Sequence, residues 1–504
     1  MIVIVITALS RRVSVSTPIA MVVGGLALSF LPFIPEFQLS PDVVFFGFLP
    51  PLVFAGGYGT AIREVKRNLR PIILLAFGLV IFTAGVVAVV TRAFVPEIGW
   101  PGAFALGGII APPDEIAATA VFERLGVPRR IVTILEGESL FNDATALVIY
   151  RFAVAAASAG AFSLLGAGTE FVLILVGGVL VGLLGGLVIE LLSRRVSDTP
   201  LAAAMTMVAP YAVYLPAEGI GATGVIAGVT AGLVARHAMR HASSDTRVVT
   251  AAVWQIWLFL LNGLVFLLLG LELRDVLRAT PFTPAVVLGA AAIVVAVVAA
   301  RFVWVFPATY LPRLIPAIKR VDPNPPWQAV VVVSWSGLRG VVSLAAALAL
   351  PADFPQRDLI LFFTFTVILA TLIGQGLTLP VVIRMLGLQR DGDTAHSEAH
   401  ARALTAEAAL RRIDELEDDW PNHKQLIDSL RGQYEHRASH VESHHAGEPG
   451  EAEKELVEHT QIRRELIEAE RRAALDLNAR GVIDDEVLRA IERDLDLEEV
   501  RMEA

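Results

Sequence analysis

The stretch that decides the fold is Ile131-Val-Thr-Ile-Leu-Glu-Gly-Glu-Ser-Leu-Phe-Asn-Asp-Ala-Thr-Ala-Leu-Val-Ile-Tyr150. It is apolar enough to cross a membrane, yet it contains five polar side chains: Glu136, Glu138, Ser139, Asn142 and Asp143. Residues four apart lie on one face of a helix. Glu138 and Asn142 therefore form one stripe, and Ser139 and Asp143 form the stripe beside it. The sequence predicts a membrane helix with a polar face.

Asp143 is expected near the middle of the bilayer. A helix that enters at Ile131 rises about 1.5 Å per residue, which places Asp143 about 18 Å deep in a hydrocarbon core about 30 Å thick. A carboxylate at that depth costs at least about 2.5 to 3.5 kcal/mol on insertion scales. A structural ion pair would explain one such acid, but five polar groups on adjacent stripes favour a functional site.

The composition is that of an integral membrane protein. The chain has 504 residues, 55% of them hydrophobic, and a mean hydropathy of +0.63, which separates it from soluble chains. Because it has no cysteine, disulfides and cysteine-ligated zinc are excluded. It also lacks the basic patch with interleaved aromatic residues that nucleic-acid binding needs, so no nucleic-acid partner is expected. The hydropathy makes the lipid bilayer the expected partner.

The charge divides the chain into two domains. Residues 1–388 contain 25 Lys and Arg against 20 Asp and Glu, whereas residues 389–504 contain 16 against 30. We therefore expect a transmembrane domain at 1–388 and an acidic, helical cytoplasmic tail at 389–504. In the tail, His436, His440 and His444 fall on one helix face, which fits a metal site, a pH sensor or, more commonly, a solvated face.

Thirteen apolar segments are expected to form membrane helices. They lie at about 1–10, 17–34, 42–58, 71–92, 101–122, 131–157, 168–193, 201–216, 220–237, 251–273, 284–311, 329–350 and 358–387. The first is shorter than a spanning helix needs, which is about 17 residues, and can be a first helix shortened by the choice of start codon.

The loop charges provide an independent check on the topology. With thirteen spans and a cytoplasmic tail, seventeen basic residues fall in inner loops and four in outer loops. The inner ones are Arg11, Arg12, Arg63, Lys66, Arg67, Arg70, Arg124, Arg129, Arg130, Arg194, Arg195, Arg236, Arg240, Arg247, Arg313, Lys319 and Arg320. The outer ones are Arg92, Arg274, Arg278 and Arg357. This asymmetry is what the positive-inside rule requires.

Three of the expected helices are interrupted. In 42–58, Pro50-Pro51 and Gly56-Gly57 predict a kink, and the other two helices each carry a charge at mid-depth. Ala111-Pro-Pro-Asp114 removes two amide donors from one helix, and Ser336-Gly-Leu-Arg-Gly340 surrounds an arginine with small residues in the other. Non-helical backbone is tolerated at membrane depth only where it lines a cavity or packs against protein. A pair of broken helices in separate halves of the chain is typical of secondary transporters built from inverted repeats.

The chemistry of these residues favours cation exchange. A hard monovalent cation prefers oxygen ligands, which two carboxylates, a hydroxyl and the carbonyls freed by a break can provide. The low dielectric of the membrane disfavours a charged carboxylate, so protons and cations compete for it. That competition is sufficient for exchange.

Three motifs resemble the first cation:proton antiporter family, the bacterial NhaP-type sodium/proton exchangers. They are Leu135-Glu-Gly-Glu-Ser-Leu-Phe-Asn-Asp-Ala-Thr-Ala-Leu-Val148, Pro112-Pro-Asp114 and Trp335-Ser-Gly-Leu-Arg-Gly-Val-Val-Ser-Leu344. The resemblance covers about residues 7–388. It implies an all-α fold of thirteen helices with broken crossing helices and inverted repeats. It further implies a homodimer in the bacterial cytoplasmic membrane, a core domain that moves against a dimer-forming domain, and electroneutral exchange of sodium for protons.

The resemblance also assigns the ion-binding residues. It implies that Asp143 binds the cation or the proton, and that Ser139 and Asp114 help to coordinate the transported Na⁺. Many family members have Thr-Asp-Pro at the first break, where this chain has Pro113-Asp114-Glu115. The threonine ligand is therefore missing, which leaves the preference among sodium, potassium and lithium open. No cofactor is implied beyond the transported ions.

Four further residues are expected to shape the site. The resemblance implies that Glu138 pairs with Arg339, that Asn142 stabilises the crossing of the broken helices, and that Arg301 is a second arginine near the crossing. Unpaired, Glu138 and Arg339 would each be strongly destabilising, whereas a pair is tolerated.

Three other functions compete with this interpretation. A small-anion/proton symporter could use Arg339 and Arg301 as ligands, but it would leave Asp143 and Asp114 unexplained. A membrane enzyme is disfavoured because the chain has no Gly-x-Ser-x-Gly or His-Glu-x-x-His motif. A receptor or scaffold would work through the tail, for which the sequence names no partner.

Overall fold

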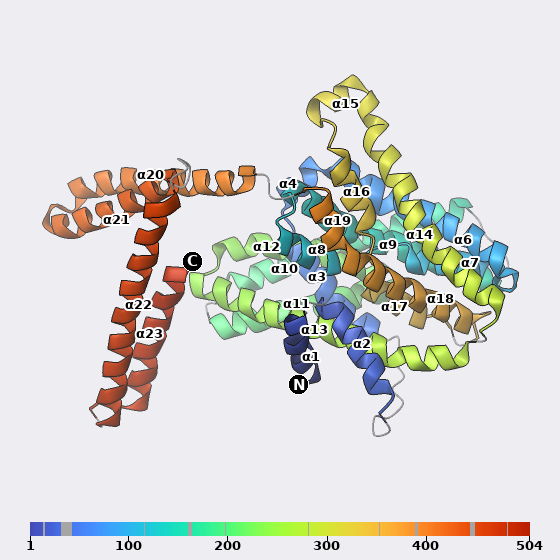
Figure 1. Ribbon diagram of the computed structural model, residues 1–504, viewed down its shortest axis with the longest axis horizontal. Coiled ribbons are helices and arrows are strands. Elements are labelled where there is room, and N and C mark those ends of the chain that lie inside the picture. The colour runs from blue at the N-terminus through green and yellow to red at the C-terminus, as the bar shows by residue number, and fades with distance from the viewer. Residues whose placement is uncertain are drawn as a thin grey trace. The chain divides into compact units, whose positions relative to one another are not determined.

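The computed structural model describes residues 1–13, 16–31, 43–114, 116–159, 164–196, 198–280, 282–351, 353–388, 392–443, 449–480 and 482–503. The chain divides into two compact units, Met1–Arg390 and Asp391–Ala504. The described residues of both units form helices and no strand (Figure 1). The expected all-α class is confirmed.

The first unit contains nineteen α-helices among its described residues. They are α1 Ile2–Val13, α2 Thr17–Ser29, α3 Leu49–Gly59, α4 Ile62–Arg67, α5 Leu69–Ile73, α6 Val80–Phe94, α7 Gly99–Ile110, α8 Ile116–Leu125, α9 Arg129–Ala159, α10 Leu164–Ser193, α11 Thr199–Gly219, α12 Gly224–Ala238, α13 Ser244–Ala279, α14 Pro284–Tyr310, α15 Pro316–Val321, α16 Trp327–Trp335, α17 Val341–Leu348, α18 Arg357–Leu369 and α19 Gly376–Met385. Each expected apolar segment holds at least one of them. Seven helical stretches of the described residues are long and apolar enough to cross a membrane, and the total of thirteen crossings stays a prediction.

The two expected interruptions that carry a charge are confirmed, whereas α3 runs without a break from Leu49 to Gly59. Residues 111–114 lie between α7 and α8, and residues 336–340 lie between α16 and α17; neither stretch is helical. The two breaks meet, because the N–H of Asp114 donates to the carbonyl of Leu338 at 2.7 Å. Each break thus supplies a hydrogen-bond partner that the other has lost from its own helix.

Three helical segments include a π-helical turn. These turns are Val43–Phe48 before α3, Leu74–Leu79 between α5 and α6, and Ala370–Gln375 between α18 and α19. A π turn widens a helix locally and leaves part of its backbone ladder irregular, and such turns are frequent at functional sites.

Glycines let α3 pack against α12 with the two backbones in contact. A Cβ atom at Gly57 would meet the carbonyl group of Val229, and one at Gly232 would meet the carbonyl oxygen of Phe54. Small residues permit this close approach in membrane helices, where packing drives association. The contact fixes α3 and α12 as one wall of the cavity described below.

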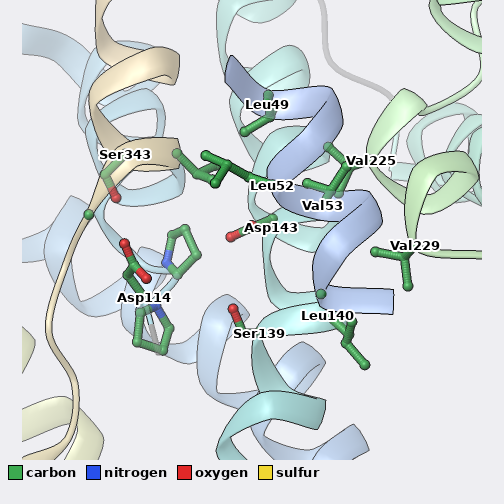
Figure 2. Close-up of a pocket in the computed structure, with 15 residues that line it drawn as sticks. Leu49, Leu52, Val53, Asp114, Ser139, Leu140, Asp143, Val225, Val229 and Ser343 are labelled. Atoms are coloured by element: carbon green, nitrogen blue, oxygen red, sulfur yellow. The ribbon is translucent and has the colours of Figure 1, made fainter. Parts of the chain in front are cut away.

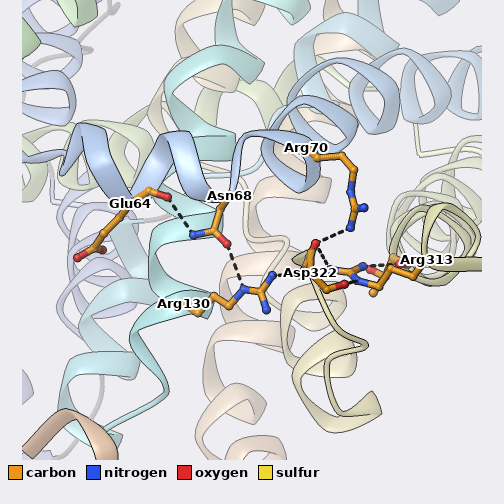
Figure 3. A network of polar contacts seen from close by, with 7 residues as sticks. Glu64, Asn68, Arg70, Arg130, Arg313 and Asp322 are labelled. Carbon is orange, nitrogen blue, oxygen red and sulfur yellow. Dashed lines mark hydrogen bonds and ion pairs between the residues drawn. The ribbon is translucent and has the colours of Figure 1, made fainter. Parts of the chain in front are cut away.

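An aspartate between α15 and α16 holds three arginines from separate parts of the unit (Figure 3). Asp322 accepts hydrogen bonds from Arg70 at 2.5 Å, from Arg130 at 2.5 Å and from Arg313 at 2.8 Å. Arg130 also donates to the side chain of Asn68 at 3.1 Å. We call these five residues the Asp322 cluster; it joins α5, α9 and the connection that follows α14.

The second unit contains α20 Gly392–Asp419, α21 Lys424–Ser443, α22 Pro449–Ala479 and α23 Asp485–Glu503. Arginines link these helices in pairs: Arg431 of α21 bonds to Asp414 of α20, and Arg471 of α22 bonds to Asp496 of α23, each at 2.7 Å. Of the expected histidine row, His444 lies outside the described residues.

Candidate functional site

A cavity lies where α9 faces the two broken helices. Its volume is about 70 Å³. Its polar lining comes from Asp114, Ser139, Asp143 and Ser343. Figure 2 shows the side-chain oxygens of these four residues turned towards a common space. The facing wall is apolar and consists of Leu49, Leu52 and Val53 of α3, Val225 and Val229 of α12, and Leu140 of α9.

The structure brings together the three residues expected to bind the cation. Ser139 and Asp143 lie one turn apart on α9 and therefore share a face, while Asp114 comes from the first break. Asp143 is 9% exposed. Among the residues that the structure describes, no arginine, lysine or histidine forms an ion pair with Asp143. Its carboxyl group is thus available to a proton or to an ion.

Asp114 lies directly against the start of α17. A Cβ atom at Gly340 would lie 2.5 Å from the Cγ atom of Asp114 and 2.8 Å from its Cβ atom, so only glycine leaves room for this carboxyl group. Gly340 is the N-cap residue of α17. A helix N-terminus carries a partial positive charge, and the carboxyl group of Asp114 lies beside it.

Asn142 and Arg339 satisfy carbonyl groups at the first break. The side-chain amide of Asn142, which is fully buried, donates to the carbonyl of Pro113 at 2.9 Å. Arg339 donates to the carbonyl of Ile110 at 2.8 Å and to that of Ala111 at 3.3 Å. Because a broken helix leaves such carbonyls without intrahelical partners, these two side chains hold the crossing together.

The expected pairing of Glu138 with Arg339 is wrong. Glu138 pairs with Arg301 of α14, whose two terminal nitrogens donate to the two carboxylate oxygens at 2.6 and 2.8 Å. The side chains are 1% and 2% exposed. This bidentate geometry, with two parallel hydrogen bonds, suits a planar guanidinium group. Arg339 lies in the break itself, where backbone carbonyls, including that of Gly337, accept hydrogen bonds from its guanidinium N–H groups.

Ser343 is the lining residue that sequence reasoning did not single out. It belongs to the motif that ends at Leu344 and lies three residues after Gly340, in the first turn of α17. A lone serine in an apolar helix gives no signal by itself. The signal available was its position just after a break that also contains a buried arginine.

Comparisons with known proteins agree with this fold. Residues 1–385 match the family model described as sodium/hydrogen exchanger, transmembrane. An uncharacterized Na⁺/H⁺ exchanger of Mycobacterium tuberculosis is 34% identical, over 99% of this chain and 94% of the relative. A sodium, potassium, lithium and rubidium/H⁺ antiporter of Bacillus pumilus is 32% identical, over 80% of this chain and 62% of the relative.

A solved structure supports the fold independently. The sodium proton antiporter MjNhaP1 of Methanocaldococcus jannaschii superposes with a TM-score of 0.59 at 19% identity, over 75% of this chain and 94% of that chain. The likeness therefore extends across nearly the whole of that antiporter. Together with the family match and the relatives, it leads to one conclusion: the chain is a membrane protein of the sodium/hydrogen exchanger family.

Proposed function

We propose that this protein exchanges a monovalent cation for a proton across the bacterial cytoplasmic membrane, and that both compete for Asp143. The observation that carries the proposal is the cavity, which gathers two carboxyl groups and two hydroxyl groups around one space. Oxygen ligands suit a hard cation, and Asp143 has no basic partner among the described residues. Sodium is the first candidate, with potassium and lithium next, because relatives are named for these ions.

The competing anion symporter is disfavoured by the positions of the arginines. Arg301 is occupied by Glu138, and Arg339 is occupied by backbone carbonyls. Neither residue lines the cavity. An anion in the cavity would instead face Asp114 and Asp143, which would repel it.

The two unlike walls support alternating access. α3 and α12 contribute only apolar side chains and glycine, whereas α9, the first break and the first turn of α17 contribute the polar groups. A polar site that slides along an apolar wall is open to one side of the membrane at a time. In this proposal α3 and α12 belong to the dimer-forming domain of a homodimer, the breaks belong to the moving core, and the tail is cytoplasmic.

The residue beside Asp143 sets the expected stoichiometry. Asn142 does not ionise, so the pair holds either one proton or one cation, and Asp114 stays ionised at the N-terminus of α17. One proton should therefore exchange for one monovalent ion. The cycle moves no net charge.

The test uses purified protein in liposomes that contain a pH-sensitive dye. Adding Na⁺, K⁺ or Li⁺ outside should move protons in the wild type, and Asp143→Asn should abolish the signal because an amide can neither ionise nor carry the proton. Asp245→Asn, a change at an exposed aspartate in the first turn of α13, should keep the wild-type rate. Exchange that survives in Asp143→Asn would overturn the role of this carboxyl group.

A second measurement in the same liposomes tests the stoichiometry. Electroneutral exchange should proceed at the same rate with and without an imposed membrane potential, because no net charge crosses. A marked acceleration by the potential would contradict one-for-one exchange while leaving the exchange activity itself established.

A further inference from the structure

The hydroxyl group of Ser343 is buried without a hydrogen-bond partner. Ser343 is 2% exposed, and its Oγ atom makes no hydrogen bond to any described residue. It lines the cavity, and Figure 2 shows Oγ turned into the space that Asp114, Ser139 and Asp143 also face. Buried polar groups are nearly always paired, so an orphaned hydroxyl in a cavity points to a ligand.

The broken helix explains why this hydroxyl is free. Ser334 and Ser336, in the same interrupted helix, donate to the carbonyls four residues earlier, at 2.8 and 2.6 Å. This is the usual way in which a helical serine is satisfied. For Ser343 the corresponding carbonyl belongs to Arg339, within the non-helical residues 336–340. Of these three serines, only Ser343 makes no hydrogen bond to its own backbone.

The first break provides no side-chain hydroxyl group to the cavity, and Ser343 lies beside this break. Pro113, which precedes Asp114, has no side-chain oxygen, and its carbonyl already accepts a hydrogen bond from Asn142. Gly340 holds the carboxyl group of Asp114 against the start of α17, the helix whose first turn contains Ser343. Asp114 and Ser343 thus stand together, facing the oxygens that α9 contributes.

We propose that Ser343 is a further ligand of the transported cation and helps to set which cation is preferred; this rests on the function proposed for the cavity. Its Oγ atom offers a lone pair to the ion. When the ion leaves and Asp143 is protonated, the same oxygen can accept a hydrogen bond from the carboxylic acid. Small ions hold their ligands closer and lose more when one is removed, so Li⁺ and Na⁺ should depend on Ser343 more than K⁺ does.

Two variants of equal shape separate the hydroxyl from the packing. Ser343→Thr keeps the hydroxyl and Ser343→Val replaces it with a methyl group. In the liposome assay, Ser343→Val should raise the KM for Na⁺ about tenfold, the size of one interaction with a charged partner. The kcat at saturating Na⁺ should stay within about twofold, and Ser343→Thr should resemble the wild type. Ser334→Ala, which removes a buried hydroxyl already bonded to Val330 and outside the cavity, should change neither value.

The outcomes distinguish this inference from the proposed function. Ser343→Ala, which adds no atoms and cannot crowd the site, repeats the test if the valine variant does not purify as a folded protein. If the wild-type protein shows no cation-driven proton movement, both the proposed exchange function and the role of Ser343 as a ligand are overturned. If the wild type exchanges ions and the Ala, Val and Thr variants have the same KM as the wild type, only the role of Ser343 as a ligand is overturned. A lowered kcat at unchanged KM would also overturn that role, because it indicates a structural one.

Discussion

Two arginines lie buried beside the site, and the backbone around each one decides its partner. Arg301 stands on the continuous helix α14, donates to the carbonyl of Val333 through Nε, and has its charge balanced by Glu138. Arg339 stands in a break, where freed carbonyls surround it. The same residue type therefore serves as an ion-pair partner in one place and as a substitute for helix hydrogen bonds in the other.

Removing either member of the Glu138–Arg301 pair should strongly destabilise the protein. Glu138→Ala or Arg301→Ala leaves one charge buried without its partner, which costs about 3 to 5 kcal/mol. The double variant should recover part of the loss, as measured by thermal unfolding in detergent. Glu138→Ala combined with Arg339→Ala should recover nothing, and equal recovery in the two double variants would contradict the observed pairing.

Residue spacing could predict part of this site. Ser139 and Asp143 share a helix face by their spacing, and Asp114 follows two prolines, so all three could be found in the sequence. The partner of Glu138 could not, because it depends on how α14 packs against α9. Ser343 was not singled out, because a serine in an apolar helix is ordinarily satisfied by its own backbone; its position just after the predicted break was the one signal in the sequence.

At the scale of the elements, the Asp322 cluster joins segments far apart in the sequence. Burial raises the pKa of the Asp322 carboxyl, but the hydrogen bonds and charges of Arg130 and Arg313 outweigh it and hold this pKa below its usual range. A carboxyl group whose pKa is lowered by folding stabilises the protein above its unfolded pKa. That stabilisation is lost as the pH falls through the lowered value.

Asp322→Asn should weaken the joint between α5, α9 and the connection that follows α14. At pH 7 the loss should be about 1 to 3 kcal/mol, the range for hydrogen bonds to a charged group, because three arginines lose their counter-charge. Melting temperatures should differ from the wild type equally at pH 6 and pH 8, and the difference should shrink only below about pH 4, near the usual pKa of aspartate. A variant as stable as the wild type at pH 7 would show that the cluster contributes nothing.

The elements themselves were largely predictable, with two exceptions. Prolines and glycines mark the two breaks directly, and apolar runs mark the helices. The π turns were not predicted, because a π turn inserts no characteristic residue into an apolar run. The Asp322 cluster was not predicted either, because Arg70 and Asp322 are 252 residues apart and no local pattern links them.

For the whole molecule, the loop charges predict which ends of the helices face the cytoplasm. The chain has no cysteine, so single cysteines at Arg67 and Arg278, both exposed, can be labelled cleanly. A membrane-impermeant reagent applied to intact cells should label the Arg278 position and not the Arg67 position. In inverted vesicles the pattern should reverse. Labelling of both positions from the same side would overturn the thirteen-span topology.

The crossing of the two breaks also sets an order for biogenesis. Arg339 reaches the carbonyl of Ile110 across 229 residues, and Leu338 supplies the acceptor for the N–H of Asp114. Synthesis runs from the N-terminus, so the first break enters the bilayer before its partner exists. Unsatisfied backbone in lipid costs several kcal/mol per group. The first break therefore lacks these hydrogen-bond partners until α16 and α17 have been synthesised, so the crossing can form only late in the synthesis of the membrane domain.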